Sequence, residues 1–368
     1  DGAAAEGVMR AIDAAIALMP DQGRETWIPP KPRRRPNPTA LVIGGTGFLG
    51  RDLTRRLVAR GQDVRVLSRG AHGPFDDLPE SVETCAVSLR DEAGLCQAMQ
   101  GIDVVYNLAR ALGTTWEDCL ENDVAVSDRI ARAAQAAGVK RFVYTGTIAS
   151  YDMSNPQTVI AESTPFAQDM TDRNLYARSK AECERRLWEM ARDHGLPLTI
   201  ARPGIVVGQG GPLQHWGIGR WHGAGAVRLW GSGDNPLPFV LIGDVSDGLI
   251  RMGESMAAPG QSFNLVGDVP LTARSYFNAI HMRLGARIRV SSGNLTTMWA
   301  ADAVKSALKT HALRRPGVIR ASLRDWQSRA HYAQFDNTKP KALLGWTPVS
   351  NREEFLQEAV DRAGLLGF

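Results

Sequence analysis

Tyr176 and Lys180 are the residues of this chain best suited to acid–base chemistry. They lie four positions apart in residues 173–194, a stretch typical of a helix, so their side chains share one helix face. A tyrosine is a poor base at neutral pH, because its unperturbed pKa is about 10. A neighbouring ammonium stabilises the phenolate and lowers that pKa. The pair can therefore donate a proton to a ketone, or accept one from an alcohol, while a hydride moves at the same carbon.

A glycine-rich turn lies about 125 residues before this pair. Residues 44–50, GGTGFLG, follow an apolar run and open a helical pattern. Glycines at 44, 47 and 50 allow an abrupt turn from strand to helix, a close approach of the backbone to a pyrophosphate, and tight packing of the helix. The helix N-terminus offers free N–H groups and a positive dipole end to phosphates. The turn therefore predicts a nicotinamide dinucleotide beside Tyr176 and Lys180.

The end of the second predicted strand, residues 63–69, indicates which dinucleotide is bound. NAD binding usually requires Asp or Glu there, to accept hydrogen bonds from the ribose hydroxyls. This strand ends in Ser68 and Arg69, with no acid. Arg69 can pair with a 2′-phosphate and stack on adenine. The sequence therefore favours NADP over NAD, and the alternative is that Arg69 is only a solvated surface residue.

Alternating strands and helices must position these residues. The predicted strands are 40–44, 63–69, 103–109, 141–147 and 198–204, and the predicted helices are 47–60, 91–100, 116–137 and 173–194. This alternation predicts an α/β fold with a doubly wound parallel sheet of the Rossmann type. We expect residues 39–204 to form the dinucleotide-binding domain. Residues 205–368 should mainly form a smaller C-terminal substrate-binding subdomain, with some segments returning to the Rossmann sheet.

The first 38 residues differ from the rest of the chain. Residues 7–19 have the apolar periodicity of a helix, and residues 20–38 form a basic, proline-rich linker. Two interpretations of residues 1–38 stay open. They form a helix that packs on the main domain, or they are the tail of an upstream domain in a fused protein.

Composition argues against several kinds of partner. The net charge is +4 and basic residues are massed only at 33–35, which does not indicate nucleic acid. No apolar run reaches about 18 residues, so no membrane partner is expected. The four cysteines form no CxxC pair, and no His lies at metal-ligand spacing from them. We therefore expect no metal, free thiols in a reducing compartment, and a cytoplasmic location.

Seven motifs resemble those of the extended short-chain dehydrogenase/reductase family, of which the sugar-nucleotide epimerases and dehydratases are the best-known branch. The resemblance covers about residues 40–350, in the family's order and spacing. The motifs are GGTGFLG (44–50), NLA (107–109), FVYTGT (142–147), YARSK (176–180), RPGIVVGQG (202–210), GSGDNPLPFVLIGDV (231–245) and KALLGWTP (341–348). The family commonly pairs two long helices, here 116–137 and 173–194, so the resemblance also implies a homodimer.

The resemblance implies roles for individual residues. Thr147 matches the catalytic Ser/Thr that hydrogen-bonds the reacting oxygen, and Asn122 matches a helix asparagine that holds a water relay near the lysine. Asn122 is equally compatible with an exposed position. Asp244 matches an aspartate that orders the substrate cleft, and a structural role for it is at least as plausible. The cofactor contacts implied by the turn and the resemblance are Gly44, Thr46, Gly47, Phe48, Leu49, Gly50, Ser68, Arg69, Ser88, Leu89, Leu108, Ala109, Tyr176, Lys180, Pro203, Gly204 and Ile205.

Some positions depart from the family's patterns. Ile148 and Ala149 follow Thr147 where dehydratases carry an Asp-Glu pair, so dehydration is disfavoured. Residues 235–239, NPLPF, lack the arginine of the branches that hold a uridine diphosphate, and residues 241–242 lack a histidine. These losses put a conventional UDP-sugar substrate in doubt.

The residues expected to line the substrate cleft are polar or aromatic. Their types suit a polyhydroxylated or aromatic ligand, because rings offer stacking surfaces and the polar groups can donate to hydroxyls or a phosphate. They are Arg110, Thr114, Thr115, Trp116, Gln209, His215, Trp216, Trp221, His222 and Arg228.

The leading hypothesis is an NAD(P)-dependent oxidoreductase or epimerase. It would act by hydride transfer at a secondary alcohol or ketone of a sugar or sugar-nucleotide, with Tyr176 as the acid/base. One alternative is an NADPH-dependent reductase of a non-sugar ketone, of the steroid or flavonoid type. The other is a non-catalytic NADP-sensing protein, which the presence of Thr147, Tyr176 and Lys180 argues against.

Overall fold

The computed structural model describes residues 2–18, 34–68, 73–111, 113–167, 169–223, 225–314 and 318–366. The chain divides into two compact units, residues 1–34 and residues 35–368. The first unit contains helix α1 (Gly2–Leu18), where the sequence predicted a helix at 7–19. The linker predicted at 20–38 falls largely outside the described residues. Within the described ranges, no helix is long and apolar enough to cross a bilayer.

The second unit is built on a seven-stranded sheet in which every pair of neighbouring strands is parallel. The spatial order is β3-β2-β1-β4-β5-β7-β13. Because the order reverses between β1 and β4, the switch point at which such sheets bind ligands lies there, and the doubly wound Rossmann architecture is confirmed. The strands are β1 (Ala40–Ile43), β2 (Val64–Ser68), β3 (Val82–Ala86), β4 (Val104–Asn107), β5 (Arg141–Thr145), β7 (Leu198–Pro203) and β13 (Ser262–Leu265).

Both edge strands of this sheet were missing from the sequence prediction. β3 reads VETCA and is mostly half-buried, so it lacks the continuous apolar run that marks the central strands. β13 is only four residues long and contributes SFNL. Its partner in the sheet is β7, about 60 residues earlier in the chain. Local patterning therefore identified the centre of the sheet and not its edges.

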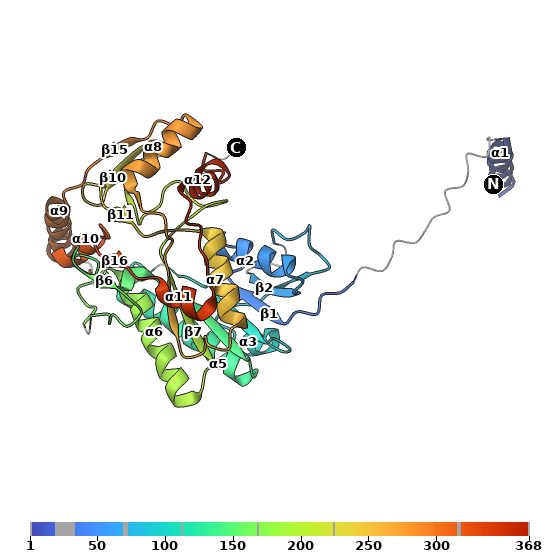
Figure 1. Cartoon of the computed structure of the whole chain (residues 1–368). Coiled ribbons are helices and arrows are strands. Elements are labelled where there is room, and N and C mark those ends of the chain that lie inside the picture. The colour runs from blue at the N-terminus through green and yellow to red at the C-terminus, as the bar shows by residue number, and fades with distance from the viewer. Residues whose placement is uncertain are drawn as a thin grey trace. The chain divides into compact units, whose positions relative to one another are not determined.

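Helices cover both faces of the sheet. On one face α2 (Phe48–Ala59) and α7 (Ile242–Glu254) lie side by side over Val42, Val66 and Val240 (Figure 1). On the other face α3 (Glu92–Ala98), α5 (Ala125–Ala136) and α6 (Leu175–His194) pack over Leu41, Ile43 and Phe142. The apolar sides of these helices are therefore used in the core of the chain itself.

The helix predicted at 116–137 is interrupted. It consists of α4 (Trp116–Cys119), a π-helical turn η1 (Leu120–Val124) and then α5. A π turn holds one residue more than an α turn, so the side chains within it point in directions that a continuous α-helix does not give. This change of direction matters for the residue that meets Lys180.

The remaining elements form the substrate-side region. A three-stranded sheet, β15-β10-β9, packs with α8 around Leu229, Phe239 and Phe277. The strands are β6 (Val159–Ile160), β8 (Ile205–Val207), β9 (Gly219–Trp221), β10 (Ala226–Leu229), β11 (Pro236–Leu237), β12 (Phe239–Leu241), β14 (Leu271–Thr272), β15 (Arg289–Ser291) and β16 (Gln334–Phe335). The helices and turns are η2 (Ile148–Ser150), α8 (Ala273–Leu284), α9 (Leu295–Ala307), η3 (Leu308–Ala312), α10 (Leu323–Ser328), α11 (Thr338–Leu344), α12 (Arg352–Leu356) and η4 (Gln357–Asp361).

Candidate active site

The glycine turn connects β1 to α2 at the switch point of the sheet. Gly44 has a φ of +80°, and a Cβ there would lie 3.2 Å from the carbonyl carbon and oxygen of Leu108. A Cβ on Gly50 would lie 2.3 Å from the carbonyl oxygen of Gly44, so the first turn of α2 packs directly on the loop. Gly47 is the N-cap of α2, and no described side chain caps this end. The turn is thus a cradle of backbone amides that fits a diphosphate.

The other residues of the turn support its shape. The methyl group of Thr46 lies beside the Gly73 position, and the ring of Phe48 lies against the Gly211 position, where an added Cβ would be 2.9 Å from the ring. Leu49 is half-buried and packs on the core beneath α2. These contacts bring the predicted cofactor turn next to the loop that follows β8.

The ends of the neighbouring strands lie at the same edge of the sheet. Ser68 ends β2, whereas Arg69 lies outside the described residues. The amide of Leu108 donates to the carbonyl of Ile43 at 3.0 Å, and the amide of Ala109 donates to the side chain of Asn107 at 3.1 Å. The ends of β1, β2 and β4 therefore meet at the glycine turn, and a cofactor site there stays a prediction.

Two further predicted cofactor segments have firm local structure. Ser88 is exposed, and its hydroxyl accepts from the amide of Arg90 at 3.2 Å, while the carbonyl of Leu89 accepts from Arg129 at 3.3 Å. In the segment 203–205, Pro203 ends β7 and Gly204 follows it. A Cβ on Gly204 would lie 2.1 Å from the carbonyl oxygen of Pro238. That same oxygen accepts from the amide of Ile205 at 2.7 Å, which explains the glycine.

Helix α6 carries the predicted acid–base pair. It begins at Leu175 with Asn174 as N-cap, so Tyr176 lies in its first turn and Lys180 one turn later. Tyr176 is half-buried and Lys180 is buried. The ammonium of Lys180 donates to the carbonyl of Ala109 at 3.3 Å, which fixes it at the carboxyl edge of β4.

Lys180 forms an ion pair with a carboxylate that the sequence analysis did not single out. Its ammonium lies 3.5 Å from Oδ1 of Asp123, in an ion pair whose side chains are 3% and 4% exposed. Ser179 donates to the other oxygen of Asp123 at 2.5 Å, and Lys180 also donates to the hydroxyl of Tyr144 at 3.1 Å. Burial raises the pKa of Tyr144 well above its ordinary value, so it is a neutral acceptor.

The structure does not bring Asn122 to Lys180. The side-chain oxygen of Asn122 accepts from Arg90 at 2.7 Å, away from the ammonium. Both Asn122 and Asp123 lie in the π-helical turn η1, and it is Asp123 that faces α6. The role of Asn122 was implied by the family resemblance, and the π-helical turn gives its side chain a different direction from that in a continuous α-helix. No local pattern singled out Asp123, because residues 116–128 also carry acids at 117, 118, 121 and 128.

Thr147 is buried at the end of β5, where the catalytic hydroxyl was predicted. It is the N-cap of η2, and its hydroxyl accepts from the amide of Ala149 at 3.1 Å. Because that bond uses a lone pair of the oxygen, the hydroxyl hydrogen stays available to a substrate oxygen.

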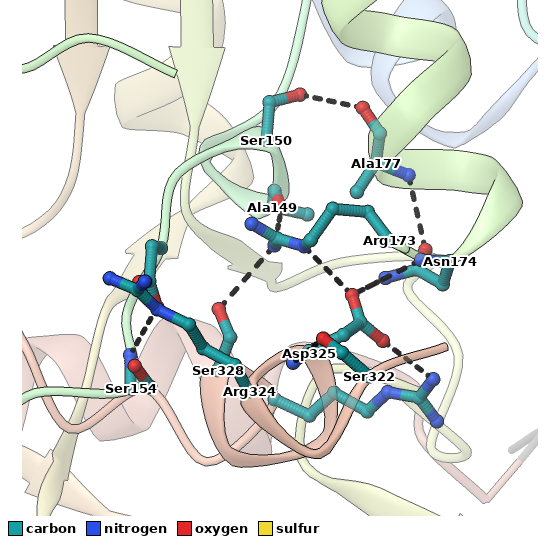
Figure 2. A network of polar contacts seen from close by, with 12 residues as sticks. Ala149, Ser150, Ser154, Arg173, Asn174, Ala177, Ser322, Arg324, Asp325 and Ser328 are labelled. Carbon is teal, nitrogen blue, oxygen red and sulfur yellow. Dashed lines mark hydrogen bonds and ion pairs between the residues drawn. The ribbon is translucent and has the colours of Figure 1, made fainter. Parts of the chain in front are cut away.

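A buried network holds the segments of Thr147 and Tyr176 together (Figure 2). Arg173 donates from Nε to Asp325 at 2.8 Å, and from Nη2 to the carbonyls of Ala149 and Tyr151 at 2.9 and 3.0 Å. Asn174 donates to Asp325 from its side chain at 2.8 Å and from its amide at 3.1 Å. The network therefore links η2, the start of α6 and α10.

Asp325 is the centre of this network and lies about 150 residues after α6 begins. It also accepts from Arg329 at 2.9 Å. Burial opposes ionisation of Asp325, yet the charges of Arg329 and Arg173 outweigh it and hold the pKa of Asp325 below its usual value. Sequence reasoning missed Asp325 and Arg173, because nothing local marks two residues that far apart as partners.

Arg110, a predicted substrate residue, lies over the ring of Tyr176, and a second one, His215, lies within reach of the charge of Arg110. The guanidinium carbon of Arg110 is 4.9 Å from the ring centroid of Tyr176. Burial and the charge of Arg110 lower the pKa of His215 to about 4, so the His215 imidazole is neutral at physiological pH.

Three other predicted substrate residues are committed to local structure. Thr114 donates its hydroxyl to Asp118 at 2.8 Å, and Thr115 forms a capping box with the same aspartate at the start of α4. Trp116 is covered by the guanidinium of Arg178, which lies 3.7 Å from its ring centroid. The hydroxyls of both threonines therefore form hydrogen bonds at the N-terminus of α4.

The predicted residues beyond 208 are spread over the substrate-side region. Trp221 packs edge to face on Phe277, with ring centroids 5.7 Å apart, so it belongs to a core cluster. The exposed ones are Gln209, Trp216, His222 and Arg228. Asp244, from the late motif, accepts from the amide of Val349 at 3.1 Å. It thereby holds the C-terminal segment, and this contact gives Asp244 a structural role.

The sequence profile of the NAD dependent epimerase/dehydratase family matches residues 40–265. The chain belongs to that family. The match runs from β1 to β13 and includes the glycine turn, Thr147, Tyr176 and Lys180. Membership confirms the family named from the motifs, and with it an NAD(P)-dependent enzyme of the extended short-chain dehydrogenase/reductase type.

Individual relatives within this family act on different compounds. The chain is 26% identical over 254 residues to a 2-alkyl-3-oxoalkanoate reductase of Stenotrophomonas maltophilia, covering 67% of this chain and 76% of that protein. It is 25% identical over 342 residues to a 3-beta-hydroxysteroid dehydrogenase of Mycolicibacterium neoaurum, covering 87% and 90%. The UDP-glucose 4-epimerase of Thermus thermophilus, solved with NAD, has the same fold, with a TM-score of 0.63 at 20% identity over 88% of this chain and 98% of that one.

Proposed function

We propose that this family member interconverts a ketone and a secondary alcohol by hydride transfer, with Tyr176 as the acid/base. The observation that carries the proposal is the placement of Lys180. Its buried ammonium is bonded to the carbonyl of Ala109 at the carboxyl edge of β4, beside the glycine turn, and Tyr176 lies one turn earlier on the same helix. Acid–base groups and a dinucleotide cradle thus share one edge of the sheet.

Each residue has a defined task in the reduction direction. The amides of residues 44–50 and the N-terminus of α2 would hold the diphosphate, and the segment 203–205 would lie against the nicotinamide. When bound, the reduced cofactor supplies the hydride. Thr147 donates its hydroxyl hydrogen to the substrate oxygen, Tyr176 gives that oxygen its proton, and Lys180 stabilises the phenolate left behind.

For the cofactor we favour NADP over NAD. The proposal depends on the absence of an acid at the end of β2 and on the basic residue that follows Ser68. NADPH and NADH titrations of the wild type and Arg69→Ala test it. We expect NADPH to bind more tightly to the wild type, and the variant to lose that preference while its affinity for NADH is unchanged.

For the substrate we favour a non-sugar oxo compound. Asn235, in the segment that lacks the diphosphate-binding arginine, uses its side chain to donate to the carbonyls of Ala330 and His331 at 2.9 and 3.0 Å. The two relatives named above, a 3-oxo acid reductase and a hydroxysteroid dehydrogenase, match two thirds of the chain or more. A sugar or sugar-nucleotide, with epimerisation as the possible outcome, stays the second candidate on the strength of family membership.

The assembly and location of the enzyme are proposed from its long helices and its free cysteines. We propose a homodimer through α5 and α6, whose outer faces border a charged hollow of about 830 Å³ that includes Arg185 and Glu189. Such an interface would be polar, and sedimentation at several protein concentrations tests it. The free cysteines Cys85, Cys96, Cys119 and Cys183 are in keeping with a cytoplasmic location.

A turnover assay tests the proposed chemistry. Oxidation of NADPH would be followed with a 2-alkyl-3-oxo acid, a 3-oxosteroid and a sugar-nucleotide, using the wild type and Tyr176→Phe. We expect turnover of a non-sugar ketone by the wild type, and a kcat lower by about 10²–10⁴-fold in the variant, because the proton donor is lost. Equal rates for the two proteins would rule out Tyr176 as the acid/base. Turnover of the sugar-nucleotide alone would favour the second candidate substrate.

A further inference from the structure

Arg110 is a cation beside Tyr176, the proposed acid/base. It forms no ion pair with a carboxylate among the described residues. It is exposed and follows Ala109, whose carbonyl accepts from Lys180. Its guanidinium carbon lies 4.9 Å from the ring centroid of Tyr176. Arg110 therefore stands at the edge of the sheet where the substrate oxygen must meet the Tyr176 hydroxyl.

The buried cations around the site differ from Arg110, because each has its own carboxylate. Lys180 lies 3.5 Å from Asp123, Arg173 lies 2.8 Å from Asp325, and Arg202 lies 2.7 Å from Glu184. Such pairs are compensated within the protein, which makes them poor sites for a substrate anion, and Lys180 keeps only its proposed role beside Tyr176. Arg110 keeps its full charge and a planar set of donors, which matches a carboxylate in a bidentate way.

We propose that Arg110 binds a carboxylate of the substrate, so that the enzyme reduces a 3-oxo acid in preference to a neutral ketone. The proposal rests on the proposed hydride-transfer function and names its substrate class. In a 3-oxo acid one carbon separates the reacting carbonyl from the carboxylate, so the two groups can reach Tyr176 and Arg110 together. The carbonyl carbon accepts a hydride from the reduced cofactor and the oxygen accepts a proton from Tyr176, which gives the 3-hydroxy acid and the oxidised cofactor.

The surroundings of Arg110 leave this position to an anion. His215, which faces Arg110, is neutral at physiological pH, so it neither repels nor replaces a carboxylate there. The contact with the Tyr176 ring is a cation–π contact, which uses none of the guanidinium's hydrogen-bond donors. A phosphate could meet the same donors, and the experiment below separates the two anions.

Matched substrates test the proposal directly. The full-length enzyme with NADPH would be assayed on a 2-alkyl-3-oxo acid and on its methyl ester, in the wild type, Arg110→Met, Arg110→Lys and Arg178→Met. We expect the wild type to prefer the acid, and Arg110→Met to lose about 10–100-fold in kcat/KM on the acid, mainly through KM, with little change on the ester. Arg110→Lys should recover part of the loss. Arg178→Met is the control, because Arg178 also stacks on an aromatic ring, that of Trp116.

A binding measurement gives a second readout that needs no turnover. Tyr176→Phe keeps the ring beneath Arg110, so titrating it with the acid and the ester reports affinity alone. The acid should bind more tightly, and the double variant with Arg110→Met should lose that difference. Equal losses on acid and ester would overturn the proposal, since Arg110 would then act through Tyr176, and tighter binding of a sugar phosphate than of the acid would overturn it in favour of a phosphate. If Tyr176→Phe instead turns substrate over like the wild type, the proposed function itself fails.

Discussion

The network around Asp325 and the pair of Arg110 and Tyr176 both flank the start of α6, yet they use charge in opposite ways. Asp325 is fully buried and accepts from Arg173, Asn174 and Arg329. Arg110 is exposed, lies over the ring of Tyr176 and pairs with no carboxylate of the described residues. In the first region every charge is satisfied inside the protein, and in the second a charge is left over. We infer that the buried ion pairs around Asp325 hold the site in place, and that Arg110, which has no such partner, binds the ligand.

This difference has an energetic side. Removing one member of a buried pair leaves its partner uncompensated in a low dielectric, which destabilises the fold by about 3–5 kcal/mol. An exposed charge contributes about 0–1 kcal/mol to stability, because water and salt screen it. Substitutions around Asp325 should therefore act on folding and activity together, whereas substitutions at Arg110 should act on substrate binding alone.

The largest expected effect is that of Asp325→Ala. It leaves Arg173 buried without its carboxylate, so we expect the free energy of unfolding to fall by about 3–5 kcal/mol. Urea denaturation followed by far-UV circular dichroism measures the change. Arg324→Ala is the matched control, because Arg324 is the neighbouring residue on α10 but its side chain is 75% exposed and pairs with Asp152. A similar loss in both variants would contradict the distinction between buried and surface pairs.

The second prediction concerns the buried partner of Lys180. Asp123→Asn keeps the shape of the side chain and removes the charge that faces the ammonium, and we expect a loss of about 1–3 kcal/mol in the free energy of unfolding. The loss should be smaller than at Asp325, because Lys180 still donates to the carbonyl of Ala109 and the hydroxyl of Tyr144. Denaturant midpoints measure it. Asn122→Ala is the control. A larger loss of stability in that variant than in Asp123→Asn would indicate that Asn122, and not Asp123, is the partner of Lys180.

The sequence predicted the parts of the molecule that are locally encoded. The apolar run of β1, the glycines of the turn and the i, i+4 spacing of Tyr176 and Lys180 each need only their own neighbours. β1 and the turn form where they were predicted, and Tyr176 and Lys180 lie one turn apart on α6. The part of the site that depends on long-range pairing was missed. Asp325 meets Arg173 across about 150 residues, and the choice between Asn122 and Asp123 depends on a π turn that no local pattern announced.

The smallest effect on stability is expected at Asp244. Asp244 and Asp325 are two aspartates whose pKa values are shifted in opposite directions. Asp244 is half-buried and Asp325 is fully buried, but burial dominates at Asp244 and raises its pKa to about 6, whereas two arginines lower the pKa of Asp325. A carboxyl whose folded pKa lies above its unfolded value of 3.8 is favoured in its neutral form. Its contribution to stability is fully present below the unfolded pKa and is lost as pH rises through about 6. Asp325 has the opposite sign, since its contribution is present at neutral pH and is lost in acid.

Asp244→Asn isolates this pH dependence. The amide oxygen can still accept from the amide of Val349, as Oδ2 of Asp244 does at 3.1 Å, so the hold on the C-terminal segment survives while the titration is removed. We expect the free energy of unfolding of the wild type to decline relative to that of the variant as pH rises from 3.8 to about 6, because only the wild type must ionise this half-buried carboxyl in that window. Urea titrations at a series of pH values measure the difference. If the two curves stay parallel, Asp244 is already ionised in the folded protein at acid pH, and Arg56, which opposes the effect of burial, governs its charge as Arg173 and Arg329 govern that of Asp325.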